Sequence, residues 1–226
     1  MSQFALKLIA MLAMVLDHSA DVFLDSGLLR TGMDASACRT LSILLHTVGR
    51  IAFPVFAWFC AEGCRKSRDP DRRLGRLLLF AVLSELPFQL ALLGKVSPGC
   101  HNVMFTLLLA SAGIRAGQIL EERGLSLARG LPGAAAAALG WVLRTDYNAW
   151  GVVLVLGLYG LREPRHRLVW AALWAAVFQL LWHGYSHGTL LWLHPGGRAP
   201  LLYCLGCLAG AALLAGYNGE RGKGPR

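Results

Sequence analysis

The sequence has little charge for its length. Only 15% of its 226 residues are charged, and 13 acidic residues stand against 22 basic ones. Soluble domains carry about 25% charged residues, so this composition argues against a soluble protein. Hydrophobic residues make up 55% of the chain and the mean hydropathy is +0.50. Because this apolar surplus runs along the whole sequence, it predicts one polytopic membrane domain covering residues 1–226.

Other familiar features are also missing. No small-residue cleavage site follows the first apolar stretch, so we expect a retained span rather than a signal peptide. The net charge of +9 comes without interleaved aromatic and basic residues, so we expect no nucleic-acid partner. His183 and His187 have the i, i+4 spacing of metal ligands, but no third ligand is evident. We therefore predict no metal.

Apolar stretches recur along the chain. A membrane-spanning helix needs about 20 residues. The fifth stretch reaches that length only by including Arg129, and the sixth is short, so either one is a candidate re-entrant or broken element. We predict an all-α fold, a polytopic bundle of about eight transmembrane helices. The stretches are Phe4–Leu24, Leu41–Gly63, Leu74–Leu93, Asn102–Leu120, Leu125–Leu143, Ala149–Leu161, Leu168–Tyr185 and Leu201–Tyr217.

Basic residues gather in alternate loops. They crowd the segments Cys64–Arg76, Arg115–Arg129 and Leu161–Arg167 and the C-terminal tail, whereas the intervening loops hold few. Basic loops of membrane proteins face the cytoplasm. The alternation therefore predicts that both termini are cytoplasmic, which an even number of spans satisfies. Pro54 and Pro87 are expected to kink their spans.

The first apolar stretch carries ionisable residues that are costly in a membrane. Lys7 and His18 are eleven positions apart, about three helical turns, and so share one face. Asp17 cannot orient His18, because neighbouring helical residues point apart, whereas Asp21 can. Such groups inside spans usually mark a substrate, ion or proton pathway. A snorkelling Lys7 or one ion pair that fixes helix packing is the simpler alternative.

Several motifs resemble those of the TraX family, which includes the conjugal-transfer pilin acetylase. They are LKLIAMLAMVLDHSADV, GRIAFPVFAWFCAEG, RLLLFAVLSELPFQLAL, HNVMFTLLL, DYNAWGVVLVL and YNGERG, in the expected order along most of the chain. Similar family members continue after the YNG segment into a final span with an FYxxH-like motif, whereas this sequence ends at Arg226.

The resemblance implies a multi-pass acetyltransferase of the bacterial inner membrane. It would move acetyl from acetyl-CoA to the N-terminus of a pilin, or to another amine or a polysaccharide of the envelope. Membrane lipid would surround the protein. His18 is the predicted general base, since imidazole titrates near neutral pH. Direct transfer is favoured, with Cys60 as the alternative acyl acceptor.

The other predicted site residues fall into groups by role. The acidic groups at the catalytic centre are Asp17, Asp21, Glu62 and Glu85. Cations for the CoA phosphates, or for the oxyanion in the case of Arg50, are Lys7, Arg50, Arg65, Arg72, Arg73 and Arg76. Polar residues for the acceptor substrate are Asn102, Asp146 and Tyr147. Two alternatives stay open, a proton-coupled transporter and a catalytically inactive family member.

Overall fold

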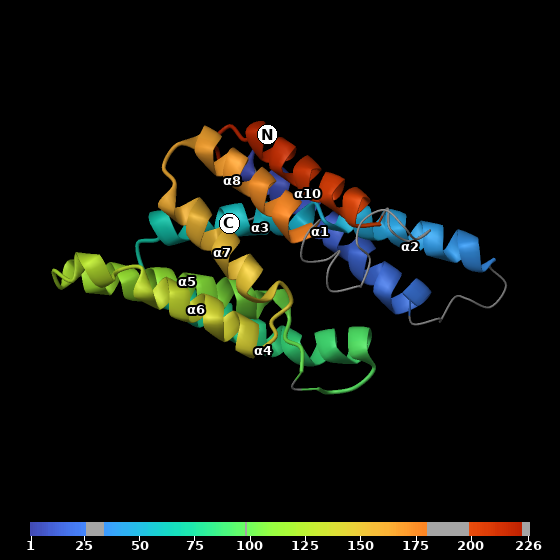
Figure 1. The fold of residues 1–226 in the computed structure, drawn as a ribbon, viewed down its shortest axis with the longest axis horizontal. Helices are drawn as coiled ribbons and strands as arrows, with labels where there is room; N and C mark the ends of the chain where they lie inside the picture. Colours follow the sequence, from blue (N-terminus) through green and yellow to red (C-terminus); the bar gives the residue numbers. More distant parts are fainter. Residues whose placement is uncertain (26–33, 98, 180–198, 223–226) are drawn as a thin grey trace. The chain divides into compact units, whose positions relative to one another are not determined.

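The computed structural model describes residues 1–25, 34–97, 99–179 and 199–222, and the regular elements in these ranges are helices (Figure 1). The predicted all-α fold is confirmed. His183 and His187 lie outside the described residues. Contacts group the helices into two compact units, Met1–Phe56 with Glu163–Arg226 as unit 1 and Ala57–Arg162 as unit 2.

Unit 1 begins with a helix that ends in a wider turn. Ser2 caps this first helix by accepting a hydrogen bond from the Ala5 N–H. The helix continues without a break into a π-helical turn, so the two together are about as long as the predicted first span. The helices of unit 1 are α1 (Gln3–Ser19), the π turn η1 (Ala20–Asp25), α2 (Ala35–Gly49), α8 (Pro164–Ala176) and α10 (Ala199–Ala215).

Glycines let α10 pack closely on α2. A Cβ at Gly210 would lie 2.6 Å from the Ile51 carbonyl oxygen, and one at Gly206 would lie 3.0 Å from Arg50 Cβ. The two glycines are four positions apart, the small-xxx-small spacing by which membrane helices approach each other. Cys204 and Cys207 are also buried on α10, and the Gln179 side-chain amide donates to Cys207 Sγ at 3.3 Å.

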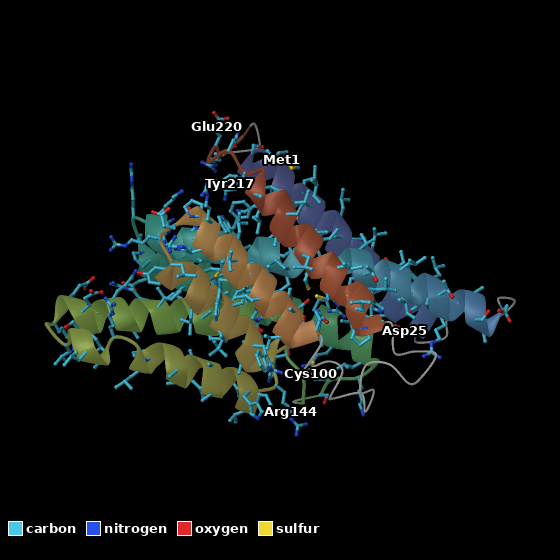
Figure 2. All side chains as sticks on the ribbon, turned by 45° about the horizontal axis from the view of Figure 1, so that its top comes forward. Met1, Asp25, Cys100, Arg144, Tyr217 and Glu220 are labelled. Carbon is cyan, nitrogen blue, oxygen red and sulfur yellow. The ribbon has the colours of Figure 1, made fainter. Side chains whose placement is uncertain are left out.

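The start of the chain lies beside the segment that holds Tyr217 and Glu220, within unit 1 (Figure 2). The Asn218 N–H donates to the Met1 carbonyl (3.0 Å), and the Gln3 N–H donates to the Glu220 carbonyl (2.9 Å). The YNGERG segment therefore holds the start of α1. This arrangement fits two ends on one side of a membrane, and the cytoplasmic assignment stays a prediction.

Unit 2 is built around α5. Helices α4, α6 and α7 all contact it, and α5 and α6 run side by side (Figure 1). Asp69 caps α4 and Asn102 caps α5, each by accepting a backbone N–H. The elements are the last part of α3 (Ala52–Lys66), α4 (Pro70–Leu93), α5 (Val103–Glu122), the 3₁₀ turn η2 (Ser126–Ala128), α6 (Leu131–Val142) and α7 (Asn148–Gly160).

Three segments among the described residues are long and apolar enough to cross a membrane: Ala35–Lys66, Pro70–Leu93 and Val103–Glu122. On α4, large apolar side chains such as Phe80, Val82 and Leu83 are more than half exposed. Apolar surface of this extent on a helix requires cover by lipid or a partner. The chain is therefore a membrane protein, and the total of about eight spans stays a prediction.

The structure changes one predicted span and trims another. The stretch Leu41–Gly63 is two helices, α2 and α3, that meet at Arg50 and Ile51. Pro54 has no N–H to donate to the preceding turn, so it starts a new helix instead of kinking one span. Arg129 lies outside α6, which begins at Leu131, so the fifth span is shorter than predicted.

Candidate functional site

A buried histidine meets three carboxylates in unit 1. His46, on α2, is 7% exposed. Its Nδ1 lies 2.9 Å from Asp17 Oδ1, and its Nε2 lies 2.9 Å from Asp25 Oδ2 and 3.8 Å from Asp21 Oδ1. These residues, Asp17, Asp21, Asp25 and His46, form the His46 cluster. It brings together two of the predicted catalytic acids, Asp17 and Asp21.

The sequence spacing places the three aspartates on one face. They lie four residues apart, the interval at which helical side chains are neighbours. Asp17 belongs to the last turn of α1, whereas Asp21 and Asp25 belong to the π turn η1. π turns are rare and frequent at functional sites. Ser42, one turn before His46, donates its hydroxyl to Asp25 Oδ1 at 2.8 Å and fixes that carboxylate.

A glycine permits the contact between the two helices. A Cβ at Gly49 would lie 2.5 Å from Asp17 Cγ and closer still to Asp17 Cβ and Oδ1. Real Cβ atoms do not approach other atoms so closely. The glycine of the GRIAFP motif is therefore what allows Asp17 to reach His46.

Both ring nitrogens of His46 face carboxylates, which bears on how many protons the His46 cluster holds. A neutral imidazole donates from one nitrogen only, yet both nitrogens of His46 face carboxylate oxygens at hydrogen-bond distance. Both contacts are hydrogen bonds only when the ring is an imidazolium or one of the carboxyl groups is protonated. Loss of that proton leaves a nitrogen lone pair against an oxygen. This chemistry suits acid–base catalysis or proton transfer.

The same side chains offer donors to a cation. Oxygens of Asp17 and Asp21 and a nitrogen of His46 lie within 4.8 Å of one another. Each His46 nitrogen already faces a carboxylate, however, so a cation would have to displace one of these partners. The absence of a metal from the function stays a prediction.

His18, the predicted base, lies at the edge of the cluster. Its side chain is 36% exposed, and its Nδ1 lies 3.6 Å from Asp21 Oδ2. The predicted pairing of His18 with Asp21 is thus present as a polar contact longer than a hydrogen bond. Asp21 faces His46 with its other oxygen, so it connects the exposed histidine to the buried one. Lys7, nearer the start of α1, is exposed.

Arg50 lies next to the cluster. Its guanidinium carbon is 5.3 Å from the centre of the Tyr203 ring, and that ring meets His46 edge-on at 6.2 Å. Tyr203 reaches this position from α10. Arg50 therefore adds positive charge beside the carboxylates, and its role toward CoA or an oxyanion stays a prediction.

Glu85 belongs to a second cluster, in unit 2. Its Oε1 accepts from Gln89 Nε2 (2.6 Å) and lies 2.7 Å from His101 Nδ1, and its Oε2 accepts from Asn102 Nδ2 (2.6 Å) and the Asn102 N–H (3.1 Å). These residues, Glu85, Gln89, His101 and Asn102, form the Glu85 cluster. Two predicted site residues, one acidic and one substrate-binding, thus lie together.

The remaining predicted substrate residues lie near the Glu85 cluster. The Asp146 N–H donates to the His101 carbonyl at 2.8 Å, beside an isolated bridge between His101 and Thr145. Tyr147, the next residue, is 5% exposed. Figure 2 shows Cys100 and Arg144 close to each other at this end of unit 2. The segments before α5 and α7 therefore meet.

Three of the predicted CoA cations have different surroundings in unit 2. Arg72 and Arg76 are exposed on α4. Arg73 turns inward, where Nη1 lies 3.2 Å from Cys64 Sγ and 3.2 Å from Ser111 Oγ. Cys60 Sγ lies 3.2 Å from the same hydroxyl. A Cβ at Gly63 would lie 2.7 Å from Arg73 Nε, so Gly63 leaves the room that this guanidinium occupies.

Arg65 binds the end of α7. Its Nη2 donates to the carbonyl oxygen of Leu158 at 3.0 Å, and also to those of Tyr159 and Leu161. Glu62, a predicted catalytic acid, pairs instead with Lys66 at 2.6 Å and with Arg65 at 3.5 Å. Arg65 and Glu62 therefore both have structural contacts at the end of α3.

Sequence reasoning missed His46 and Asp25. The available signal was the repeat of aspartate at positions 17, 21 and 25, which marks one acidic helix face. A single apolar helix does not reveal which cation that face meets. His46 is four residues before Arg50 on the next helix, so only the packing of α1 on α2 identifies it.

Comparisons with known proteins agree with the TraX-like motifs found in the sequence. The sequence profile described as "TraX protein" matches residues 2–192. The chain belongs to the TraX family. The probable fimbrial assembly protein FimC (serogroup H1) of Dichelobacter nodosus is 33% identical over 191 residues, which are 80% of this chain and 70% of that protein. No solved structure matches. The TraX match includes both clusters.

Proposed function

We propose that this chain is a membrane acetyltransferase that moves an acetyl group from acetyl-CoA to an amine of a pilus or fimbrial subunit. Membership of the TraX family and the fimbrial assembly protein among its relatives support a function in pilus or fimbria formation. The observation that supports the chemistry is the His46 cluster, because ionisable groups inside membrane helices are costly and usually mark a functional site.

The reaction needs a group that accepts a proton. The amine nitrogen forms a bond to the thioester carbonyl carbon, the carbon–sulfur bond breaks, and CoA leaves as the thiolate. The attacking amine then gives up a proton, and the thiolate takes one. His18 is exposed enough to contact the amine, and the carboxylate of Asp21 lies between it and His46. His18 acts as the base, and the His46 cluster stabilises the positive charge that His18 gains.

The test is release of CoA by the purified protein in nanodiscs, with acetyl-CoA and a peptide that carries a free N-terminal amine. We expect release to depend on the peptide, to be abolished by His18→Ala and to fall strongly in His46→Ala. His166→Ala is the matched control, because His166 is an exposed histidine of the same unit. Full activity of His18→Ala, or no peptide-dependent release by the wild type, would contradict the proposal.

A second candidate function is proton-coupled transport. Three aspartates around one histidine, in helices of a membrane protein, also suit a proton pathway. Proteoliposomes that contain a pH-sensitive dye distinguish the two. A proton flux that His46→Ala removes, together with no CoA release, would favour transport.

A further inference from the structure

Unit 2 contains a cavity that the proposed chemistry does not use. Its volume is about 660 Å³, within the usual range of about 300–1,000 Å³ for small-molecule sites. It lies where the end of α5, the start of α6 and the end of α7 come together, beside Arg65 of α3. All of these ends adjoin the basic segments that the sequence predicts to be cytoplasmic.

The cavity is electropositive. Its charged lining residues are Arg65, Arg129, Arg162 and one acid, Glu121. Arg129 pairs with Glu121 at 3.1 Å, which offsets one of the three positive charges. Arg65 is held in place by the carbonyl oxygens of α7, and Arg162 is exposed. Arg65 also pairs with Glu62 at 3.5 Å, but Lys66 shares that carboxylate at 2.6 Å. Positive charge therefore still exceeds negative charge around the cavity, a composition that suits phosphate.

The wall between the arginines is apolar and aromatic. Ile114 and Leu156 line it, together with Tyr159, whose hydroxyl accepts a hydrogen bond from Gln118 at 2.9 Å. The Arg65 guanidinium carbon is 5.6 Å from the centre of the Tyr159 ring. A flat apolar surface beside cations is the combination that a purine with attached phosphates requires.

Glycines keep the space open. A Cβ at Gly130, before α6, or at Gly160, the last residue of α7, would meet nothing within 4 Å. Gly113 on α5 and Gly133 on α6, by contrast, allow those helices to touch, since a Cβ at Gly113 would lie 3.1 Å from Gly133 Cα. A Cβ at Gly130 or Gly160, both of which line the cavity, would therefore lie in open space.

We propose that this cavity binds the phosphorylated nucleotide end of CoA, its adenosine 3′,5′-bisphosphate. The proposal rests on the acetyltransferase function above and names the place where the co-substrate is held. The phosphates contact Arg65 and Arg162, and the adenine lies against Tyr159 and its apolar neighbours. The phosphate of an anionic lipid shares this chemistry, so the test includes both sources.

The experiment measures binding of adenosine 3′,5′-bisphosphate and of CoA to the full chain in nanodiscs of neutral phosphatidylcholine. Gly130→Leu and Gly160→Leu fill the cavity, and Arg162→Ala removes a cation. Gly75→Leu is the matched control, because a Cβ at Gly75 on α4 also meets nothing within 4 Å. We expect each cavity variant to raise Kd at least about tenfold, and the control to bind like the wild type.

Two results would overturn the proposal. One is that adenosine 3′,5′-bisphosphate fails to bind, or that the cavity variants bind it as tightly as Gly75→Leu does. The other is that nanodiscs with phosphatidylglycerol abolish nucleotide binding at physiological CoA concentration, which assigns the cavity to lipid. Melting temperatures near that of the wild type show that the leucine variants are folded.

Turnover separates this proposal from the acetyltransferase itself. If the wild type releases CoA and Gly130→Leu leaves the KM for acetyl-CoA unchanged, the cavity assignment fails and the function stands. If the nucleotide binds in the cavity but no peptide-dependent release occurs, the acetyltransferase fails. The cavity assignment is supported if Gly130→Leu raises the KM for acetyl-CoA and leaves kcat unchanged. The acetyltransferase function is supported if His18→Ala loses turnover but still binds the nucleotide.

Discussion

Replacing Gly49 by alanine tests the contact on which the His46 cluster depends. In an ordinary helix, glycine to alanine stabilises by about 1 kcal/mol through helix propensity. Here the new Cβ would lie 2.5 Å from Asp17 Cγ, so α1 and α2 must separate or Asp17 must leave His46. Overpacking of this kind costs about 1–3 kcal/mol. Gly49→Ala should therefore lower stability.

Gly75→Ala is the control, for which we expect a change in melting temperature of the opposite sign. Gly75 is also helical, but a Cβ there meets nothing within 4 Å, so only the propensity gain remains. For a protein of this size about 1 kcal/mol corresponds to about 2–4 °C, so Gly49→Ala should melt about 2–12 °C below the wild type and Gly75→Ala slightly above it.

The assay is thermal unfolding in detergent, and the signal is the reaction of cysteine thiols that become exposed as the protein unfolds. The effects of Gly49→Ala and Asp17→Gly on stability should be coupled, because Asp17→Gly removes the Cβ and carboxylate that the new methyl group would meet. Gly49→Ala should then cost less in the Asp17→Gly background than alone. Equal melting temperatures for Gly49→Ala and the wild type, or equal costs in both backgrounds, would refute the close approach of α1 and α2 at this point.

Three further predictions concern other parts of the chain. Gly210→Ala should destabilise by about 1–3 kcal/mol, measured by the same unfolding assay, because its Cβ would lie 2.6 Å from the Ile51 carbonyl oxygen. Burial and then the Asp146 carboxylate raise the pKa of the Cys100 thiol above its ordinary 9.0, so its alkylation at pH 8, followed by mass spectrometry, should be slower than that of a free thiol and faster in Asp146→Asn. The neighbouring serine hydroxyl and backbone N–H groups hold the pKa of Asp34, which caps α2, below its ordinary 3.8. The stability that this cap adds is present above pH 3.8 and is lost as the pH falls through the lowered pKa, so the wild type should lose melting temperature relative to Asp34→Asn on acidification.

Helix type was predictable from the sequence, and helix ends were not. The predicted apolar stretches overlap α4, α5, α7 and α10, but each of these helices extends beyond its predicted stretch at one end. The break at Arg50 and Ile51 was missed because a window of hydropathy cannot distinguish one long span from two helices. Pro54 carried the signal, since a proline near a helix start indicates a new helix as readily as a kink.

Within the site, the sequence identified Asp17 and Asp21, but neither Asp25 nor the histidine that these carboxylates meet. Asp17 and Asp21 were recognised because carboxylates in an apolar helix are energetically costly and usually mark a functional site. His46 has no acidic residue near it in the sequence, and its contact with the carboxylates follows only from the approach of α1 to α2 at Gly49. Likewise Glu85 and Asn102 were chosen separately, and their contact through the loop before α5 is a tertiary feature.

The two histidine–carboxylate arrangements differ in a way that separates structure from chemistry. A carboxylate has about four lone-pair sites, and Glu85 meets four nitrogens, those of Gln89, His101 and the Asn102 side chain and backbone. All four acceptor sites of that carboxylate are therefore used by groups that connect α4 to the start of α5, which indicates a structural role. The His46 cluster has the opposite balance, three carboxylates around one imidazole. Its surplus of acceptors leaves room for a further proton, and His18 stands at its exposed edge. A base that takes a proton from a substrate is helped by that surplus, so we expect the chemistry at His18, beside the His46 cluster, and a structural role for the Glu85 cluster.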